Sequence, residues 1–178
     1  SIPNLSITAT TANSVYLTAG AGAGIVTVTN TFTLNNAAQT FTTNGKLAIA
    51  NNATVNYTSG AISAAPAYAG TINLVGLTFA NGATFPSFIW PSTAGLVTNL
   101  TINGAAGNVI NVPGARTLTG GALNLTSGTL AATAAANTLT LTSGTTINRT
   151  NLGAVTLTLV APGDNNINLN YIANAAIG

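Results

Sequence analysis

The feature that most constrains this chain is a short alternation of apolar and polar residues that recurs along its whole length. Leu, Ile, Val or Phe alternates with Thr or Asn over a few residues, and clusters of Gly, Asn, Ser and Ala separate the runs. Such alternation is typical of strands with one buried side, and β-branched residues favour strands. The clearest runs are IVTVT (25–29), KLAIA (46–50), TVNYT (54–58), INLV (72–75), ALNLT (122–126), TLTLT (138–142) and VTLTLV (155–160). The pattern predicts an all-β fold.

These runs return at a nearly constant interval. Runs that begin near Thr117, Thr138 and Val155 are 21 and 17 residues apart. Two or three short strands in each recurrence are typical of solenoid coils, which bury their inward side chains only by stacking on their neighbours. We therefore expect a parallel, right-handed β-solenoid with about 20 residues per coil. A β-sandwich or jelly roll made of the same strands is the alternative.

A longer repeat divides the chain in two. The stretch 46–60 aligns with 138–152 at an offset of 92 residues, so that Leu47 matches Leu139 and Val55 matches Ile147. We expect a first β unit at 1–95 and a second at 96–178 within one continuous solenoid. Neither end carries the charged cap that a free solenoid needs, which predicts that the chain is one stretch of a longer repeat protein.

Few side chains of this chain can carry a charge or move a proton. Only Lys46, Arg116, Arg149 and Asp164 carry full charges, and the sequence contains no His, Cys, Met or Glu. General acid–base catalysis needs a titratable group beside the reacting atoms, and glycosidases need two carboxylates. Zinc and transition-metal sites need clustered His, Cys or carboxylate ligands. The composition therefore predicts a protein that is not an enzyme and that holds no cofactor or metal.

The same composition bears on partners and location. The scattered cations do not form the cluster that neutralises phosphates, so we expect no nucleic-acid binding. No apolar run approaches the ~20 residues of a membrane-spanning helix. Charged residues make up only 2% of the chain, so repulsion does little to keep copies apart, and the expected partners are copies of itself or adjoining repeats. The absence of the oxidisable residues Cys and Met fits an extracellular location.

Three stretches resemble a known class of proteins. They are NGKLAIANNATVNYTSG (44–60), TNLTINGAAGNVINV (98–112) and ALNLTSGTLAATAAANTLTLTSGTTINRT (122–150). They resemble repeat regions of large secreted Bacteroidetes surface proteins of the type exported by the type IX secretion system, including gliding-type adhesins. The chain departs from that class in its Ala-rich turns. The resemblance implies a β-solenoid shaft at the cell surface, and we expect a non-catalytic structural segment of an extracellular filament or adhesin stalk.

Two other functions remain open from the sequence. In a pilus or thread subunit, the segment SIPNLSITAT (1–10) would complete the sheet of a neighbouring subunit by donor-strand complementation. In an ice-binding β-solenoid, Thr-x-Thr pairs such as Thr27/Thr29, Thr31/Thr33 and Thr138/Thr140 would form a flat array of hydroxyl and methyl groups. These pairs do not return at one phase in every recurrence, so the sequence favours ordinary exposed strand faces instead.

Two groups of residues are candidate sites. Six sequons of the form Asn-x-Ser/Thr are candidate glycosylation sites of a secreted filament, although a chain rich in Asn and Thr produces such matches by chance. They are Asn4, Asn52, Asn56, Asn99, Asn124 and Asn148. The segment 79–91 breaks the alternation and concentrates Phe79, Phe85, Phe88 and Trp90. These aromatic side chains could form a docking patch for a partner, but the sequence favours a local core plug. Lys46, Arg149 and Asp164 are expected to be isolated, solvated charges.

Overall fold

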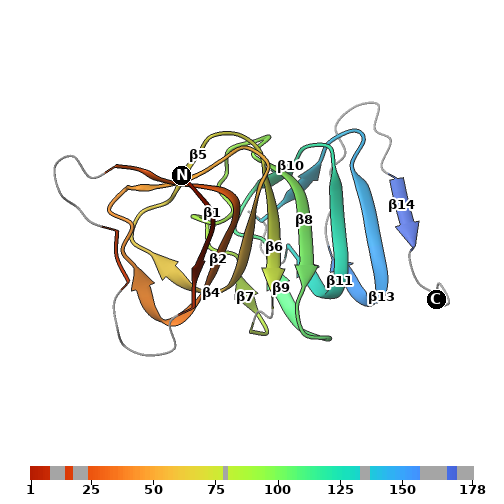
Figure 1. The fold of residues 1–178 in the computed structure, drawn as a ribbon. Coiled ribbons are helices and arrows are strands. Elements are labelled where there is room, and N and C mark those ends of the chain that lie inside the picture. The colour runs from red at the N-terminus through yellow and green to blue at the C-terminus, as the bar shows by residue number, and fades with distance from the viewer. Residues whose placement is uncertain (9–14, 18–23, 78–79, 133–136, 157–167, 172–178) are drawn as a thin grey trace.

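The computed structural model describes residues 1–8, 15–17, 24–77, 80–132, 137–156 and 168–171. These residues form fourteen strands and no helix, and every strand pair among them is parallel. Successive coils stack from β1 at one end to β14 at the other (Figure 1). The fold is a β-solenoid, which confirms the predicted fold class.

The bounds of the strands are as follows. They are β1 (Ile2–Ile7), β2 (Val26–Phe41), β3 (Leu47–Ile49), β4 (Ala53–Ile62), β5 (Ala67–Tyr68), β6 (Ile72–Leu77), β7 (Ala83–Thr84), β8 (Val97–Asn103), β9 (Val109–Asn111), β10 (Arg116–Leu118), β11 (Ala122–Ala131), β12 (Leu139–Leu141), β13 (Thr146–Thr156) and β14 (Asn168–Tyr171). The long strands bend around corners of the coil at breaks in register, as between Leu34 and Asn35 in β2.

Each coil presents three faces. The first face holds β1, β6, β8, β14, the middle of β2 and the first parts of β4, β11 and β13. The second face holds β7, β9 and the later parts of β2, β4, β11 and β13. The third face holds β3, β5, β10, β12 and the start of β2. The first-face strands run side by side in Figure 1, with β1 and β2 at one end of the row and β13 and β14 at the other.

The register of the first face explains the long sequence repeat. One inward column passes through successive coils as Leu5, Phe32, Val55, Leu74, Leu100, Leu123 and Ile147. Its members are separated by 27, 23, 19, 26, 23 and 24 residues, so a coil contains about 23 residues rather than 20. The offset of 92 that relates Val55 to Ile147 is four of these coils. The boundary at Gly95 falls inside a continuous ladder, because β6 pairs directly with β8.

The alternating residues of the sequence point alternately into a buried, apolar interior and onto the outer surface. In β6 the inward Ile72 and Leu74 are fully buried, whereas the alternate residues Asn73 and Val75 are half-buried on the outside. The neighbouring inward residues Val55 and Leu100 are also fully buried. Each coil therefore covers the apolar side chains of the next, which is why no single coil can be stable alone.

At 58–60 and 126–128 the sequence Thr-Ser-Gly lies at a corner between the first and second faces. Gly60 and Gly128 adopt φ values of 105° and 83° at equivalent corners. Such values suit glycine because it lacks a Cβ atom. A Cβ atom on Gly60 would lie 2.5 Å from the carbonyl oxygen of Asn36 in the coil below. Gly60 is therefore required by close approach of two backbones as well as by its dihedral angle.

The aromatic segment is a core plug. Phe85 and Trp90 are fully buried, and their rings meet edge to face with centroids 5.4 Å apart. Phe88 is half-buried against Tyr57, with ring centroids 6.5 Å apart. The alternative prediction, that this segment is a docking patch, is wrong for Phe85 and Trp90. Their rings are enclosed by neighbouring coils and cannot contact a partner. Phe79 lies outside the described residues.

Arg116 occupies an inward position on the third face and is 7% exposed. Its Nε donates a hydrogen bond to the carbonyl oxygen of Trp90 at 2.7 Å, and its Nη1 donates to the carbonyl oxygen of Ala115 at 2.8 Å. Burial lowers the pKa of this guanidinium from its ordinary value. Arg116 thus serves as a structural donor, which fixes the plug segment to the next coil.

We expect the stability of this protein to change little from mildly acidic pH to about pH 9 and to fall above about pH 10. Burial raises the pKa of Tyr68 and of Tyr57, and the Tyr68 hydroxyl donates to the carbonyl oxygen of Phe88 at 3.0 Å. Above about pH 10 the unfolded chain loses these protons while the folded chain keeps them. The stabilisation is therefore present below the unfolded pKa and is lost as the pH rises towards the folded pKa.

Thermal unfolding followed by circular dichroism across this pH range tests the expectation. Tyr68→Phe should lessen the alkaline loss, whereas Tyr16→Phe, at a side chain that is 68% exposed, should leave it unchanged. A steep loss of stability between about pH 5 and pH 8, where tyrosine does not titrate, would contradict this account.

Candidate interaction surface

The outer side of the first face carries two straight columns of short, uncharged side chains. Column A consists, from β2 to β13, of Thr31, Thr54, Asn73, Asn99, Ala122 and Thr146. Column B lies two residues further along each strand and consists of Thr33, Asn56, Val75, Thr101, Asn124 and Asn148. All twelve side chains are half-buried, because neighbours in adjacent coils shield one another.

Hydrogen bonds between coils hold these columns in order. In column B, Nδ2 of Asn148 donates to Oδ1 of Asn124 at 2.7 Å, and Nδ2 of Asn124 donates to Oγ1 of Thr101 at 3.2 Å. In column A, Nδ2 of Asn99 donates to Oδ1 of Asn73 at 2.7 Å. Stacked Asn side chains form such ladders when parallel strands are in register. The face is therefore preorganised before it meets any partner.

Most sequons belong to these two columns. Asn56, Asn99, Asn124 and Asn148 point outward from the first face, and each donates its side-chain amide to a neighbouring coil. The other two sequon residues, Asn4 and Asn52, are exposed. Glycosylation stays a prediction at all six positions. At the four column positions a glycan would be attached through the nitrogen that donates to the neighbouring coil, and it would replace one of the two N–H groups of that nitrogen.

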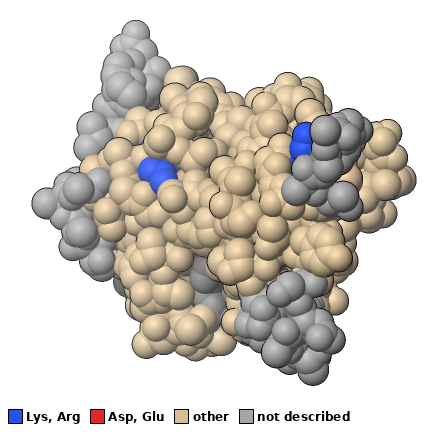
Figure 2. Space-filling view, turned by 90° about the vertical axis from the view of Figure 1, so that its left-hand side faces the viewer, with Lys and Arg blue, Asp and Glu red and all other residues tan. Residues whose placement is uncertain are grey.

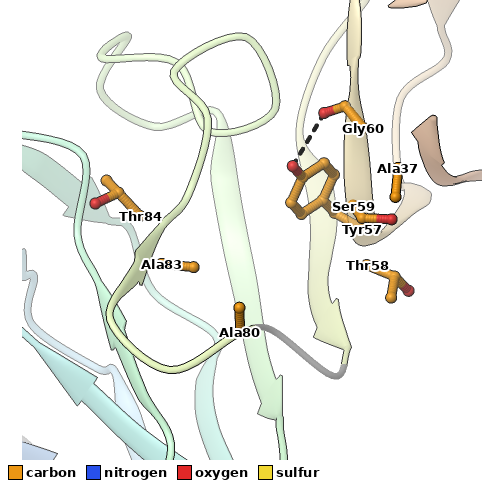
Figure 3. A pocket seen from close by; sticks show the side chains of 8 residues that line it. All are labelled: Ala37, Tyr57, Thr58, Ser59, Gly60, Ala80, Ala83 and Thr84. Atoms are coloured by element: carbon orange, nitrogen blue, oxygen red, sulfur yellow. Dashed lines mark hydrogen bonds between the residues drawn. The ribbon is translucent and has the colours of Figure 1, made fainter. Parts of the chain in front are cut away.

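A pocket of about 460 Å³ lies where the second face is interrupted. The later part of β4 pairs with β2, whereas β7 pairs with β9, and no pairing joins β4 to β7 among the described residues. Ala37, Tyr57, Thr58, Ser59 and Gly60 lie on one side of the pocket, and Ala80, Ala83 and Thr84 lie on the other (Figure 3).

The chemistry of this pocket is neutral. Among the described residues that line it, the one titratable side chain is that of Tyr57, whose hydroxyl donates to the carbonyl oxygen of Gly60 at 3.0 Å (Figure 3). That hydroxyl thus satisfies a carbonyl group at the break in the ladder. The pocket offers hydroxyl groups and methyl walls but brings together no acid and base, so it provides no catalytic pair of the kind that proton transfer needs.

Charged side chains are sparse on the described surface. Viewed down the stack from the end that carries β1 and β2, the described surface shows two small basic patches (Figure 2). Lys46 is half-exposed at a turn that leads into the third face, Arg149 lies in β13 on the first face, and Asp164 lies outside the described residues. Within the described part of the chain, no three potential metal ligands of the His, Cys, Asp or Glu type gather.

The Thr-x-Thr pairs do not share one face. Thr27 pairs with Ala48 and Thr140 pairs with Thr117, and both belong to the third face, whereas Thr31 and Thr33 belong to columns A and B. Sequence reasoning missed the columns because the coil length varies between 19 and 27 residues and because Asn, Val or Ala replaces Thr in several coils. The signal that could have found them is the single outward residue on each side of the Phe32, Val55 and Leu74 column.

The described residues contain no helix of the length and hydrophobicity that crossing a membrane requires. Comparisons of the chain with protein-family models, with curated proteins and with solved structures find no match.

Proposed function

We propose that this chain is a non-catalytic structural segment of an extracellular filament or adhesin stalk on the cell surface. The observation that carries the proposal is the continuous parallel ladder on the first face, which runs from β1 to β14. Eight strands at a spacing of about 4.8 Å span roughly 34 Å along the axis. A ladder of this kind extends by adding coils, and each added coil extends the same core.

The interior and the surface both suit a shaft. The inward column of the first face is fully buried from Phe32 to Leu123, so bending the rod would expose apolar surface and be opposed by the hydrophobic effect. The neutral exterior allows copies to lie close to one another without charge repulsion. The resemblance of 98–112 and 122–150 to repeat regions of secreted surface proteins supports the extracellular location.

The pairing of β1 argues against donor-strand complementation. That alternative places the N-terminal strand in the sheet of a neighbouring subunit. Here β1 pairs with β2 of its own chain over the register Leu5 with Phe32 to Ile7 with Leu34. The first strand thus completes its own solenoid.

The test is cryo-electron microscopy of the source cells, combined with labelling by antibodies raised against the purified, folded chain. The proposal expects labelled fibres outside the cell in which coils continue at a rise of about 4.8 Å. A label confined to the cell interior would overturn it. Density in which a strand of one subunit enters the sheet of the next would establish the donor-strand alternative instead.

A further inference from the structure

Columns A and B form a surface with a two-dimensional repeat. Neighbouring members of a column are about 4.8 Å apart, because this is the spacing of hydrogen-bonded strands, and the two columns are separated by two residues, or about 6.6 Å. The register is continuous through six strands, from Thr31 and Thr33 in β2 to Thr146 and Asn148 in β13. The surface is therefore a lattice rather than a pocket, and its partner should also be periodic.

The chemistry of the columns fits a neutral partner that both donates and accepts hydrogen bonds. No member is charged or aromatic, and most are Thr or Asn, whose hydroxyl and amide groups do both. The remaining members, Val75 and Ala122, add methyl groups to those of the threonines. A nucleic acid or a charged polymer would need opposite charges on this face, and the columns contain none.

The size and order of the face argue against a protein partner. A stable protein interface buries about 800 Å² on each side and depends on aromatic and Arg anchors. The two columns span only about 24 Å by 7 Å and contain no such anchor. Their side chains are already fixed by bonds such as Asn148 to Asn124 and Asn99 to Asn73, so little conformational entropy remains to be lost when a rigid lattice is bound.

We propose that columns A and B bind the surface of ice. Crystalline water is a neutral, periodic lattice of hydrogen-bond donors and acceptors, which matches the uncharged and periodic character of the columns. Hydroxyl and amide groups hold water molecules at the spacings of the columns, and the methyl groups between them limit the positions that the water can take. Bridging water of this kind is enthalpically nearly as good as direct hydrogen bonding. The activity would be additional to a structural role and does not depend on it.

The test measures thermal hysteresis and inhibition of ice recrystallisation by the purified full chain. The wild-type protein should hold ice crystals below their melting point and shape them. Thr101→Lys places a long, charged side chain in the middle of column B and should reduce both activities to the level of buffer. Thr117→Lys makes the same change on the third face, opposite Thr140, and should retain them. Circular dichroism and the melting temperature show whether each variant is folded.

A second variant guards against misfolding of the first. Val75→Lys changes another half-buried member of column B and should cause the same loss. Wild-type protein without thermal hysteresis would overturn the proposal, as would equal losses from Thr101→Lys and Thr117→Lys. Ultracentrifugation that shows a dimer disrupted by Thr101→Lys would assign the face to a second copy. Glycans on Asn124 or Asn148 of the native protein would also overturn it, because they would cover the columns.

Discussion

Replacing Trp90 by Ala is expected to lower the free energy of unfolding by about 3–5 kcal/mol, the usual result of emptying a large aromatic site in a core. Trp90 is fully buried, its ring meets Phe85 edge to face, and its carbonyl oxygen accepts the bond from Arg116. The cavity would lie between coils, where the ladders on either side limit how far the structure can collapse. Urea unfolding followed by circular dichroism measures the change as a lower midpoint.

Two further variants make this result specific. Trp90→Phe should lose less, because a ring remains in the site. Tyr16→Ala removes an aromatic side chain that is 68% exposed and should change stability by no more than about 0.5 kcal/mol. If Trp90→Ala were as stable as the wild type but altered self-association, the aromatic segment would be a docking surface rather than a core plug.

The second large effect is expected at Gly121, with Gly120 beside it as a matched control. Both residues have left-handed backbones, with φ values of 65° and 63°. A Cβ atom on Gly121 would lie 2.3 Å from the carbonyl oxygen of Thr98 in the preceding coil, whereas a Cβ atom on Gly120 would meet nothing within 4 Å. Gly120→Ala should therefore cost only the left-handed strain, about 1–2 kcal/mol.

Gly121→Ala should cost roughly 3 kcal/mol or more, because the same strain is joined by a backbone clash that a neighbouring strand must move to relieve. The movement would also disturb the hydrogen bond from the Ala122 amide to Oδ1 of Asn99, which is 2.9 Å long. The difference between the two variants isolates the close approach of the coils, since the strain is common to both. Equal stabilities of Gly120→Ala and Gly121→Ala would show that the coils are not packed as closely as described.

The candidate surface shows where prediction from the sequence stopped. The alternation around Val55 and Leu74 indicated which residues point inward, and the offset of 92 residues indicated that Val55 and Ile147 are equivalent. The lateral neighbours of an outward residue depend on the exact length of every coil. Thr33 meets Asn56 after 23 residues, but Asn56 meets Val75 after only 19. No fixed period would have aligned these three.

The role of the aromatic segment also could not be predicted from the sequence alone. Phe85, Phe88 and Trp90 stand out in the sequence because they interrupt the alternation, and aromatic residues serve both cores and interfaces. Only their placement distinguishes the two roles. Trp90 lies inside the third face because Arg116 and Tyr68 in the flanking coils bond to the carbonyl groups of the segment.

The sequence by itself determined the all-β class, the inward and outward residues of most strands and the near absence of charge, because each follows from local alternation or from composition. The tertiary structure alone decided the length of each coil, the burial of the plug and the alignment of columns A and B. The physical reason is that side chains in different coils become neighbours through backbone hydrogen bonds between distant strands. Corners such as Gly60 and Gly121, which adopt left-handed φ values, set how many residues separate those strands.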